Sequence, residues 1–420
     1  MKKSELPDTK FTSNGNLATT QNLTTNNLRA VLDDMGVTVH FNVMLSRAEY
    51  RAAGLAADDD LAQDRLRAVI QDTLLALDIN ALGRYDELVS NFARAQPYHP
   101  MEEWLQGVVW DGVDRVQQLI DSVTTDTELW PVYLENWLIQ TVEGVCGWRD
   151  RQAKKSLPHV LTLVGAQGLG KSHWLKNLGG RWFKGEAELH LGTSAGKDHQ
   201  IAALKYPMVE LAELDGIFRK ADVSHMKAFI SREEDELRAP YERRALVRPR
   251  MTSFCASVNE PEFLNDDTGS RRFWPVLVEA IDWSVRVDVA QLWGQVYDMW
   301  QSESSFNLTA EEDTLRAETA LSMHTLVTPE EELIDEYYRV HHGNPRFEDV
   351  PMNRTEILKM LHGRHVQFSN RQISSYGKIL VSILGKHQTM SGKRRSWLFP
   401  YNEFASDRST WPTKSHLKSV

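Results

Sequence analysis

The sequence predicts a mixed α/β fold whose centre is a parallel sheet with crossover helices. Between residues 151 and 300, short apolar runs typical of buried strands alternate with helical patterns, which is the order that parallel sheets require. One of these runs, His159–Val164, leads into a glycine-rich loop and then into a helical stretch that reaches Leu178. We expect a mainly helical region before this core and a basic, winged-helix-like module after it.

The composition of each segment justifies this division. The first residues are rich in Thr, Asn and Ser, which is typical of a flexible arm, and Leu61 to Leu77 form an amphipathic helical stripe. Near the end, Arg354–Leu361 and Asn370–Gly385 predict two helices, and His387–Phe399 predicts a hairpin that turns at Ser391-Gly392. The expected segments are a flexible arm (1–28), a mainly helical N-terminal region (29–150), the α/β core (151–300), a linking helix (301–329), the winged-helix-like module (330–402) and a tail (403–420).

Composition excludes several classes of protein. Hydrophobic residues at 41% and charged residues at 25% are ordinary globular values, which excludes wholesale disorder. Apolar runs such as Val160–Val164 are far shorter than the roughly 18 residues that a membrane-spanning helix needs. The N-terminus has no apolar signal-peptide core, and Cys146 and Cys255 cannot by themselves form a disulfide framework or a zinc site. We expect a cytoplasmic protein without a membrane partner.

The charge is unevenly distributed. The chain has a formal net charge of −10, yet residues 341–420 contain 13 Lys/Arg against 5 Asp/Glu. The other 340 residues contain 35 against 53. An acidic body with a basic end favours a separate module that contacts a polyanion, and a solvated basic face is the alternative.

The glycine-rich loop carries the most specific motif. Residues Gly165-Ala-Gln-Gly-Leu-Gly-Lys-Ser172 match GxxxxGK[S/T] between a strand and a helix, the setting in which backbone N–H groups surround a phosphate. Lys171 is expected to reach the β- and γ-phosphates of ATP, and the Ser172 hydroxyl to ligate Mg²⁺. The residues expected to bind the nucleotide are Gly165, Gln167, Gly168, Leu169, Gly170, Lys171, Ser172 and His173.

An acidic strand follows about 40 residues later. In Tyr206–Gly216, apolar residues lead into carboxylates. Glu210 is the candidate for the magnesium shell and Glu213 for activating the attacking water. Side chains three residues apart on an ideal strand point to opposite faces, so both roles require a turn between them, and Asp215 is the reserve. Carboxylates on a solvated strand end are the alternative.

Two further groups of polar residues suit the same chemistry. The strand Met251–Val258 ends near Asn259, our first choice for sensing the γ-phosphate, with Ser257 as the second; an Asn that only begins a turn is the alternative. Arg271 and Arg272 follow a glycine turn and suit an arginine finger, because a guanidinium can meet phosphate oxygens bidentately. Solvated surface arginines are the alternative.

These motifs resemble the virulence-associated protein E (VapE/VirE-domain) family of phage- and island-encoded ATPases, which are similar to superfamily 3 helicases and belong to the AAA+ class. The resembling stretches are His99–Leu105, Trp110–Arg115, Val164–Ser172, Val209–Asp215, Lys227–Phe229, Asp235–Tyr241, Ser257–Asn259 and Thr268–Pro275. The resemblance covers about residues 100–280. It implies a P-loop core and ATP-driven translocation on DNA during replication of a mobile element. Many relatives carry a primase domain, whose acidic metal-binding signature we do not find before the loop.

Two segments are candidates for contacting nucleic acid. The resemblance to superfamily 3 implies a channel hairpin between the acidic strand and the Asn259 strand, where Tyr241 would stack on bases and Arg243 and Arg244 would contact phosphates. In the C-terminal module, Lys393, Arg394 and Arg395 would lie on the DNA backbone. A basic surface loop and a protein-contact module are the respective alternatives.

We therefore expect an ATP-dependent DNA helicase or translocase that acts in replication as a homo-oligomeric ring, a hexamer by the resemblance. The rival hypothesis is a nucleotide-switched ATPase in a defence or regulatory assembly that does not unwind DNA. A small-molecule kinase would leave the arginine pair and the basic module without a role. Stimulation of ATP turnover by single-stranded DNA separates the first hypothesis from the other two.

Overall fold

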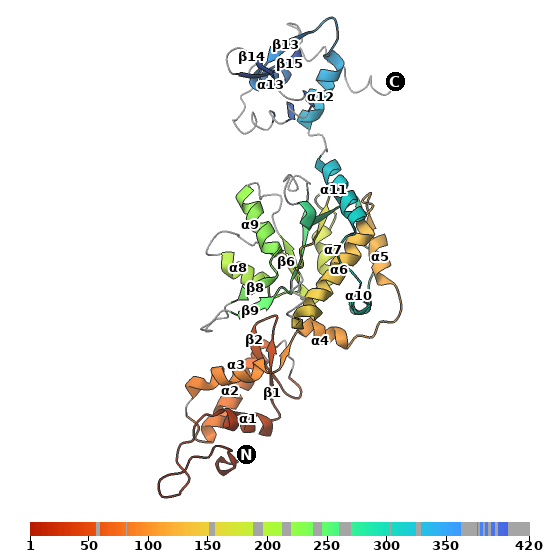
Figure 1. Cartoon of the computed structure of the whole chain (residues 1–420). Coiled ribbons are helices and arrows are strands. Elements are labelled where there is room, and N and C mark those ends of the chain that lie inside the picture. Colours follow the sequence, from red (N-terminus) through yellow and green to blue (C-terminus); the bar gives the residue numbers. More distant parts are fainter. Residues whose placement is uncertain are drawn as a thin grey trace. The chain divides into compact units, whose positions relative to one another are not determined.

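A computed structural model describes most of the chain, which forms two compact units, Met1–Leu321 and Ser322–Val420 (Figure 1). The described residues are 1–55, 59–80, 82–150, 156–187, 196–211, 220–237, 246–259, 270–302, 304–324, 329–362, 376, 379–380, 383–384, 388–390 and 394–401. Among them, no helix has both the length and the apolar character that crossing a membrane requires.

The N-terminal part of the first unit combines helices with a small sheet. The strands β1 (Thr38–Asn42) and β2 (Arg47–Arg51) pair antiparallel, and β3 (Pro97–Tyr98) joins β1 in parallel. The helices α1 (Thr25–Asp34), α2 (Asp60–Ala76) and α3 (Tyr85–Arg94) share one apolar core with this sheet, to which Leu28, Ile70 and Phe41 contribute. The expected mainly helical region therefore also contains a three-stranded sheet.

The first residues of the chain are packed rather than loose. Leu6 and Leu23 are each 3% exposed and belong to the core just described. The Thr24 side chain accepts a hydrogen bond from the Asn27 backbone N–H and so caps α1. The terminal amine forms an ion pair with Asp34 at 2.9 Å. The structure thus differs from the flexible arm expected for residues 1–28, because a few buried leucines outweigh a polar composition.

The core of the first unit is a five-stranded sheet, and all its pairings are parallel. Its order is β11-β5-β10-β7-β6. The strands are β5 (Val160–Val164), β6 (Phe183–Ala187), β7 (Met208–Leu211), β10 (Ser253–Val258) and β11 (Phe273–Leu277). Every residue of β5 is buried, as a strand covered on both faces requires. The predicted α/β fold with a parallel sheet is confirmed.

Helices before and after the strands complete this core. They are α4 (Pro100–Gln106), α5 (Arg115–Asp121), α6 (Trp130–Cys146), α7 (Lys171–Gly179), α8 (Gly196–Ala203), α9 (Lys220–Ile230), α10 (Val289–Gln301) and α11 (Ala310–His324), and Figure 1 shows α6 running beside the sheet. Trp137 of α6 donates its indole N–H to the Phe254 carbonyl at 2.7 Å. Gln140 exchanges two hydrogen bonds with the backbone of His159. The core therefore begins with α4, well before the boundary expected at residue 150.

A hairpin of β8 (Glu234–Leu237) and β9 (Leu246–Pro249) is anchored by two buried arginines. Arg250 pairs with Asp235 at 2.8 Å, and both side chains are at most 1% exposed. Arg248 donates to the carbonyls of Val43, Met44 and Leu204, and burial lowers its pKa to about 10. These contacts join the hairpin to the β1–β2 turn and to the residue after α8.

The second unit pairs helices with an antiparallel sheet of order β13-β15-β14. Its elements are α12 (Pro329–His341), β13 (Glu348–Met352), α13 (Arg354–His362), β14 (Gln388–Met390) and β15 (Arg394–Tyr401). Tyr376, Ile379 and Leu380 form its core together with Ile357 and Phe399. The antiparallel pairing of β14 with β15 places a hairpin where the sequence predicts one.

Candidate functional site

The carboxyl ends of β5, β10 and β7 meet at one edge of the sheet. Val258 of β10 lies opposite Val164 of β5, and Ala256 lies opposite Leu211 of β7. Directly after β5, the Gly165 N–H donates to the Val258 carbonyl at 3.2 Å. In open α/β sheets the edge formed by the carboxyl ends is where ligands bind.

The loop after β5 depends on its glycines. Gly168 has φ +91° and Gly170 has φ +85°, in the left-handed region that L side chains rarely adopt. A Cβ at Gly165 would overlap the carbonyl oxygen of Val278. Gly170 is also the N-cap of the nine-residue helix α7 and offers its first turn no side-chain hydrogen bond. The N–H groups at a helix N-terminus suit an anion such as phosphate.

Lys171 holds its charge inside this loop. The side chain is buried, with the residue 6% exposed. Its Nζ donates to the carbonyls of Gly165 at 2.7 Å and Ala166 at 3.0 Å, and it lies 3.5 Å from the Asn259 Oδ1. The structure thus brings together Lys171 and Asn259, which the sequence assigns to the same phosphate group.

A hydrogen-bonded chain joins Ser172 to Glu210. The Ser172 and Ser257 hydroxyls are 2.8 Å apart, and the Ser257 hydroxyl donates to the Glu210 Oε1 at 2.8 Å. Glu210 is only 2% exposed. Its charge, added to burial, raises the pKa of the neighbouring Cys255 thiol well above its usual value. Ser257, the second choice from sequence after Asn259, is therefore the residue that links the two expected magnesium ligands.

The donor set of this chain fits a magnesium ion. The Ser172 hydroxyl lies within hydrogen-bond distance of the Ser257 hydroxyl, which in turn lies within hydrogen-bond distance of the Glu210 carboxylate. Mg²⁺ prefers oxygen ligands and is usually held by one or two carboxylates together with substrate phosphates. Within the described part of the chain, no group of three or more His, Cys, Asp or Glu residues is gathered to hold a metal. Ser172 and Glu210 therefore suit a metal shared with a phosphate rather than one enclosed by protein.

Several candidates from the sequence lie outside the described residues. These are Glu213, Asp215, Tyr241, Arg243, Arg244 and Lys393. Residues 238–245 connect the paired ends of β8 and β9, where Leu237 lies opposite Leu246. The backbone of Arg394 and Arg395 begins β15, but their side chains are outside the described set.

Arg271 and Arg272 lie at the other edge of the sheet. They end a short 3₁₀ turn directly before β11, whose first residue lies opposite Val160 and whose last lies opposite Val164. Five residues of strand, about 15 Å, therefore separate the pair from the glycine-rich loop of the same chain. Both line a cleft with His159 and Trp274. Arg272 contacts Ser231, and burial and the charge of Arg271 lower its pKa.

Trp283 is a residue of the site that sequence reasoning missed. A Cβ on Gly170 would overlap its indole ring, and its ring centroid lies 5.2 Å from that of His173. The indole follows β12 (Ala280–Ile281), which pairs with β4 (Val123–Thr124). The Asp282 N–H then donates to the Ser122 carbonyl at 2.7 Å. No local pattern marks this tryptophan, because its contact with the loop is made across the fold.

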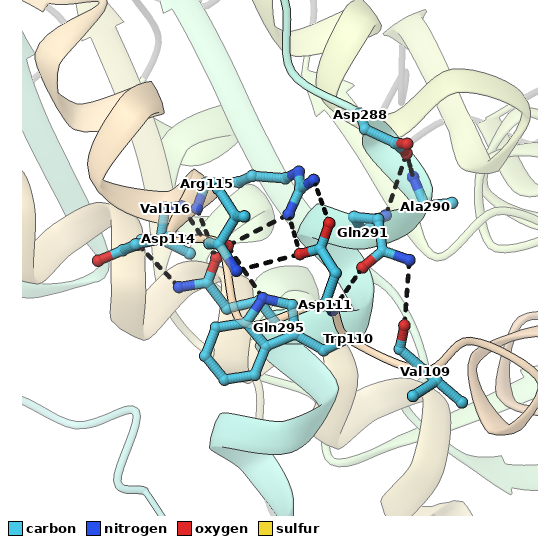
Figure 2. A network of polar contacts seen from close by, with 11 residues as sticks. Val109, Trp110, Asp111, Asp114, Arg115, Val116, Asp288, Ala290, Gln291 and Gln295 are labelled. Carbon is cyan, nitrogen blue, oxygen red and sulfur yellow. Dashed lines mark hydrogen bonds and ion pairs between the residues drawn. The ribbon is translucent and has the colours of Figure 1, made fainter.

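A polar network joins the residues before and at the start of α5 to α10 (Figure 2). Gln295 accepts from the Arg115 and Val116 N–H groups and donates to Asp114 at 2.8 Å. Gln291 accepts from the Asp111 N–H and donates to the Val109 carbonyl. The Arg115 guanidinium holds Asp111 through two hydrogen bonds and keeps the pKa of that carboxyl low, at about 2.

A family model described as the virulence-associated protein E-like domain matches residues 105–324. The match covers just over half of the 420 residues. The chain belongs to the virulence-associated protein E-like domain family. The matched region begins in α4 and ends with α11, so the family's domain contains the whole five-stranded sheet, the Ser172–Glu210 chain and the arginine pair. The resemblance expected from the motifs is confirmed at the level of this family.

Among solved structures, the chain is similar to the NrS-1 C terminal region. The apo structure of that region (305-718) is 14% identical with a TM-score of 0.42, and the match covers 89% of this chain and 98% of that chain. An A form apo structure is 12% identical with a TM-score of 0.43 and the same coverage. A likeness this distant carries no functional argument. The comparison with curated proteins finds no match.

Gly170→Ala should destabilise the protein more than Gly168→Ala. Both substitutions force a side chain into the left-handed region, which costs each variant about 1 kcal/mol. Among the described residues, nothing lies within 4 Å of a Cβ on Gly168, whereas a Cβ on Gly170 meets Trp283. We expect a further loss of roughly 1–3 kcal/mol for Gly170→Ala. Urea denaturation measures the difference, and equal midpoints would contradict the contact between loop and indole.

Proposed function

We propose that the chain is a P-loop ATPase of the AAA+ class, related to superfamily 3, that hydrolyses Mg-ATP at the carboxyl edge of its sheet. The observation that carries this proposal is the hydrogen-bonded chain from Ser172 through Ser257 to Glu210, beside the buried charge of Lys171. A strand, a glycine loop and a helix N-terminus set these groups at one place, and this is the setting that phosphate binding requires.

Each residue has a distinct task in this proposal. Lys171 neutralises charge on the β- and γ-phosphates, and the N–H groups of Gly168 to His173 surround them. Ser172 and Glu210 hold Mg²⁺, which when bound offsets phosphate charge. Glu213 accepts the proton of the attacking water. Asn259, 3.5 Å from the Lys171 ammonium, is placed to orient that water or the γ-phosphate.

We further propose that the ATPase works on DNA as a helicase or translocase in the replication of a phage or other mobile element. Support comes from membership of the virulence-associated protein E-like domain family. The β8–β9 hairpin also supports this assignment. The residues that connect its two strands, 238–245, include the proposed DNA contacts Tyr241, Arg243 and Arg244. The described elements of the second unit, a helix, a strand, a second helix and two paired strands, are compatible with a winged helix, which would set Lys393 to Arg395 on a DNA backbone.

The proposed active assembly is a ring, with six subunits as in superfamily 3. Arg271 and Arg272 lie about 15 Å from the loop of their own chain, across five residues of strand. A guanidinium at that edge serves hydrolysis only if it reaches the nucleotide of a neighbouring subunit. Contacts between unlike edges of identical subunits form a ring when the rotation from one subunit to the next closes.

Lys171→Ala should abolish ATP turnover and leave the fold intact, because it removes charge from the phosphates rather than apolar contacts from the core. Glu213→Gln should bind ATP but turn it over poorly, since an amide cannot accept the proton of water. Lys176→Ala, an exposed lysine on the same helix, is the matched control and should keep full activity. Phosphate release and nucleotide binding are measured for each. Normal turnover by Glu213→Gln would transfer its role to Asp215 or Glu210.

Activity should depend on assembly. Turnover per subunit should fall steeply on dilution, because each site needs an arginine from its neighbour. Mixing Lys171→Ala subunits with Arg271→Ala/Arg272→Ala subunits should restore part of the activity, since one type of interface then contains an intact loop and an intact arginine pair. Full specific activity in a monomer proven by sedimentation would refute the shared site.

The two proposed DNA contacts should be separable. Replacing Lys393, Arg394 and Arg395 by Ala should weaken duplex binding and flatten its salt dependence by up to about 0.9 log units per lost contact, with basal ATP turnover unchanged. Replacing Tyr241, Arg243 and Arg244 should instead remove stimulation by single-stranded DNA. Binding titrations at two salt concentrations and ATPase assays test both. A protein that no DNA stimulates would favour the nucleotide-switched assembly instead.

A further inference from the structure

A cleft lies beside Trp283, the residue whose indole contacts Gly170 of the glycine-rich loop. It has a volume of about 290 Å³ and is lined by α5, α7, the segment after β12 and the start of α10. Its floor is apolar, formed by Leu119, Leu178 and Leu292. Its rim is exposed and polar, with Asn177, Asp282 and Arg286 beside the indole. An apolar cleft with a few convergent polar groups is the usual form of a small-molecule site.

The same indole contacts the loop and lines the cleft. One part of Trp283 lies against Gly170 and His173, at the N-terminus of α7. Trp174, Asn177 and Leu178 continue the cleft along that helix. Seven residues of helix, about 10 Å, separate Gly170 from Asn177. A ligand with its phosphates at the loop is therefore long enough to place the group attached to those phosphates in the cleft.

We propose that this cleft binds the base of the nucleotide, with Trp283 stacking on a purine. This inference rests on the proposed nucleotide-binding function of the loop. Trp283 lines the cleft and is 37% exposed, so part of its indole is accessible to a ligand, and aromatic side chains stack on bases of any kind. A purine covers more of the indole and the leucine floor than a pyrimidine does. The rim offers donors at Arg286 and Asn177 and a carboxylate at Asp282 for the base edge.

The walls of the cleft are fixed before any ligand arrives. The Gln291 and Gln295 contacts shown in Figure 2 hold residues 109–116 to α10, and α5 and α10 supply Leu119 and Leu292. The Ser122 hydroxyl accepts the Trp174 indole N–H at 3.1 Å, which ties the end of α5 to α7. Because these side chains are already held in place, binding of a ligand costs little conformational entropy, and this favours its affinity. The region before the sheet thus forms part of the nucleotide site.

Trp283→Ala tests the proposal through two probes, ATP and tripolyphosphate, measured by calorimetry with Mg²⁺ present. We expect the Kd for ATP to rise about 5- to 100-fold, as loss of one stacking contact does, and the Kd for tripolyphosphate to stay unchanged. Trp283→Phe should recover most of the affinity. The original protein should bind ATP and GTP more tightly than CTP and UTP, and Trp283→Ala should lose this preference.

The outcomes separate the two hypotheses. If the original protein binds neither ATP nor tripolyphosphate, the proposed function fails. If the original protein binds both ligands and Trp283→Ala weakens the binding of both equally, only the base site fails, because the indole then supports the loop. If Trp283→Ala weakens the binding of neither ligand, the base site also fails, because the indole then has no role in binding. Should Trp283→Ala not fold, Asn177→Trp fills the cleft from an exposed position of α7 and should block ATP while sparing tripolyphosphate. Unchanged ATP binding by Asn177→Trp would overturn the proposal.

Discussion

The candidate site depends on the parallel pairing of β10 with both β5 and β7. This register sets Ser257 opposite Leu163 and Cys255 opposite Glu210, so that the Ser257 hydroxyl lies between Ser172 and the Glu210 carboxylate. A shift of one residue would turn Ser257 to the other face of the sheet and break the chain. Lys171 depends on the same pairing, because Asn259 follows β10 directly.

The same parallel geometry separates the arginines from the loop. The first residue of β11 lies opposite the first residue of β5, and the last residues of the two strands also lie opposite each other. Residues just before β11 are therefore at the amino edge of the sheet, whereas residues just after β5 are at the carboxyl edge. Arg271 and Arg272 thus present positive charge on one edge, while the loop presents N–H groups and Lys171 on the other. Two complementary edges on one chain are the geometry of a head-to-tail assembly, which is why the proposed function takes the form of a ring.

The sequence was sufficient where the signal is local. The strand before Gly165, the glycine loop, the helix after it and the acidic strand with Glu210 all lie where the motifs predict them, within one parallel sheet. What could not be predicted depends on contacts between distant segments. Leu6 and Leu23 are isolated apolar residues in polar sequence, and only the folded N-terminal core shows that they are buried. Trp283 meets Gly170 from the segment after β12, which pairs with β4, and α6 contacts the sheet region through Trp137 and Gln140.

Two buried arginines anchor the stem formed by β8 and β9. Arg250 fixes the stem of the hairpin to Asp235 and to the Phe229 carbonyl, and it is three residues before β10 begins at Ser253. Arg248 fixes the same stem to the β1–β2 turn through two carbonyls. A buried charge held by several acceptors is costly to displace, so the stem moves as a body with its anchors rather than bending alone. In the proposed enzyme, these anchors are the contacts through which a shift of β10 at Ser257 or Asn259 would reach the β8–β9 stem and the turn between β1 and β2. In the proposed enzyme, the N-terminal part is mechanically joined to the element that would grip DNA.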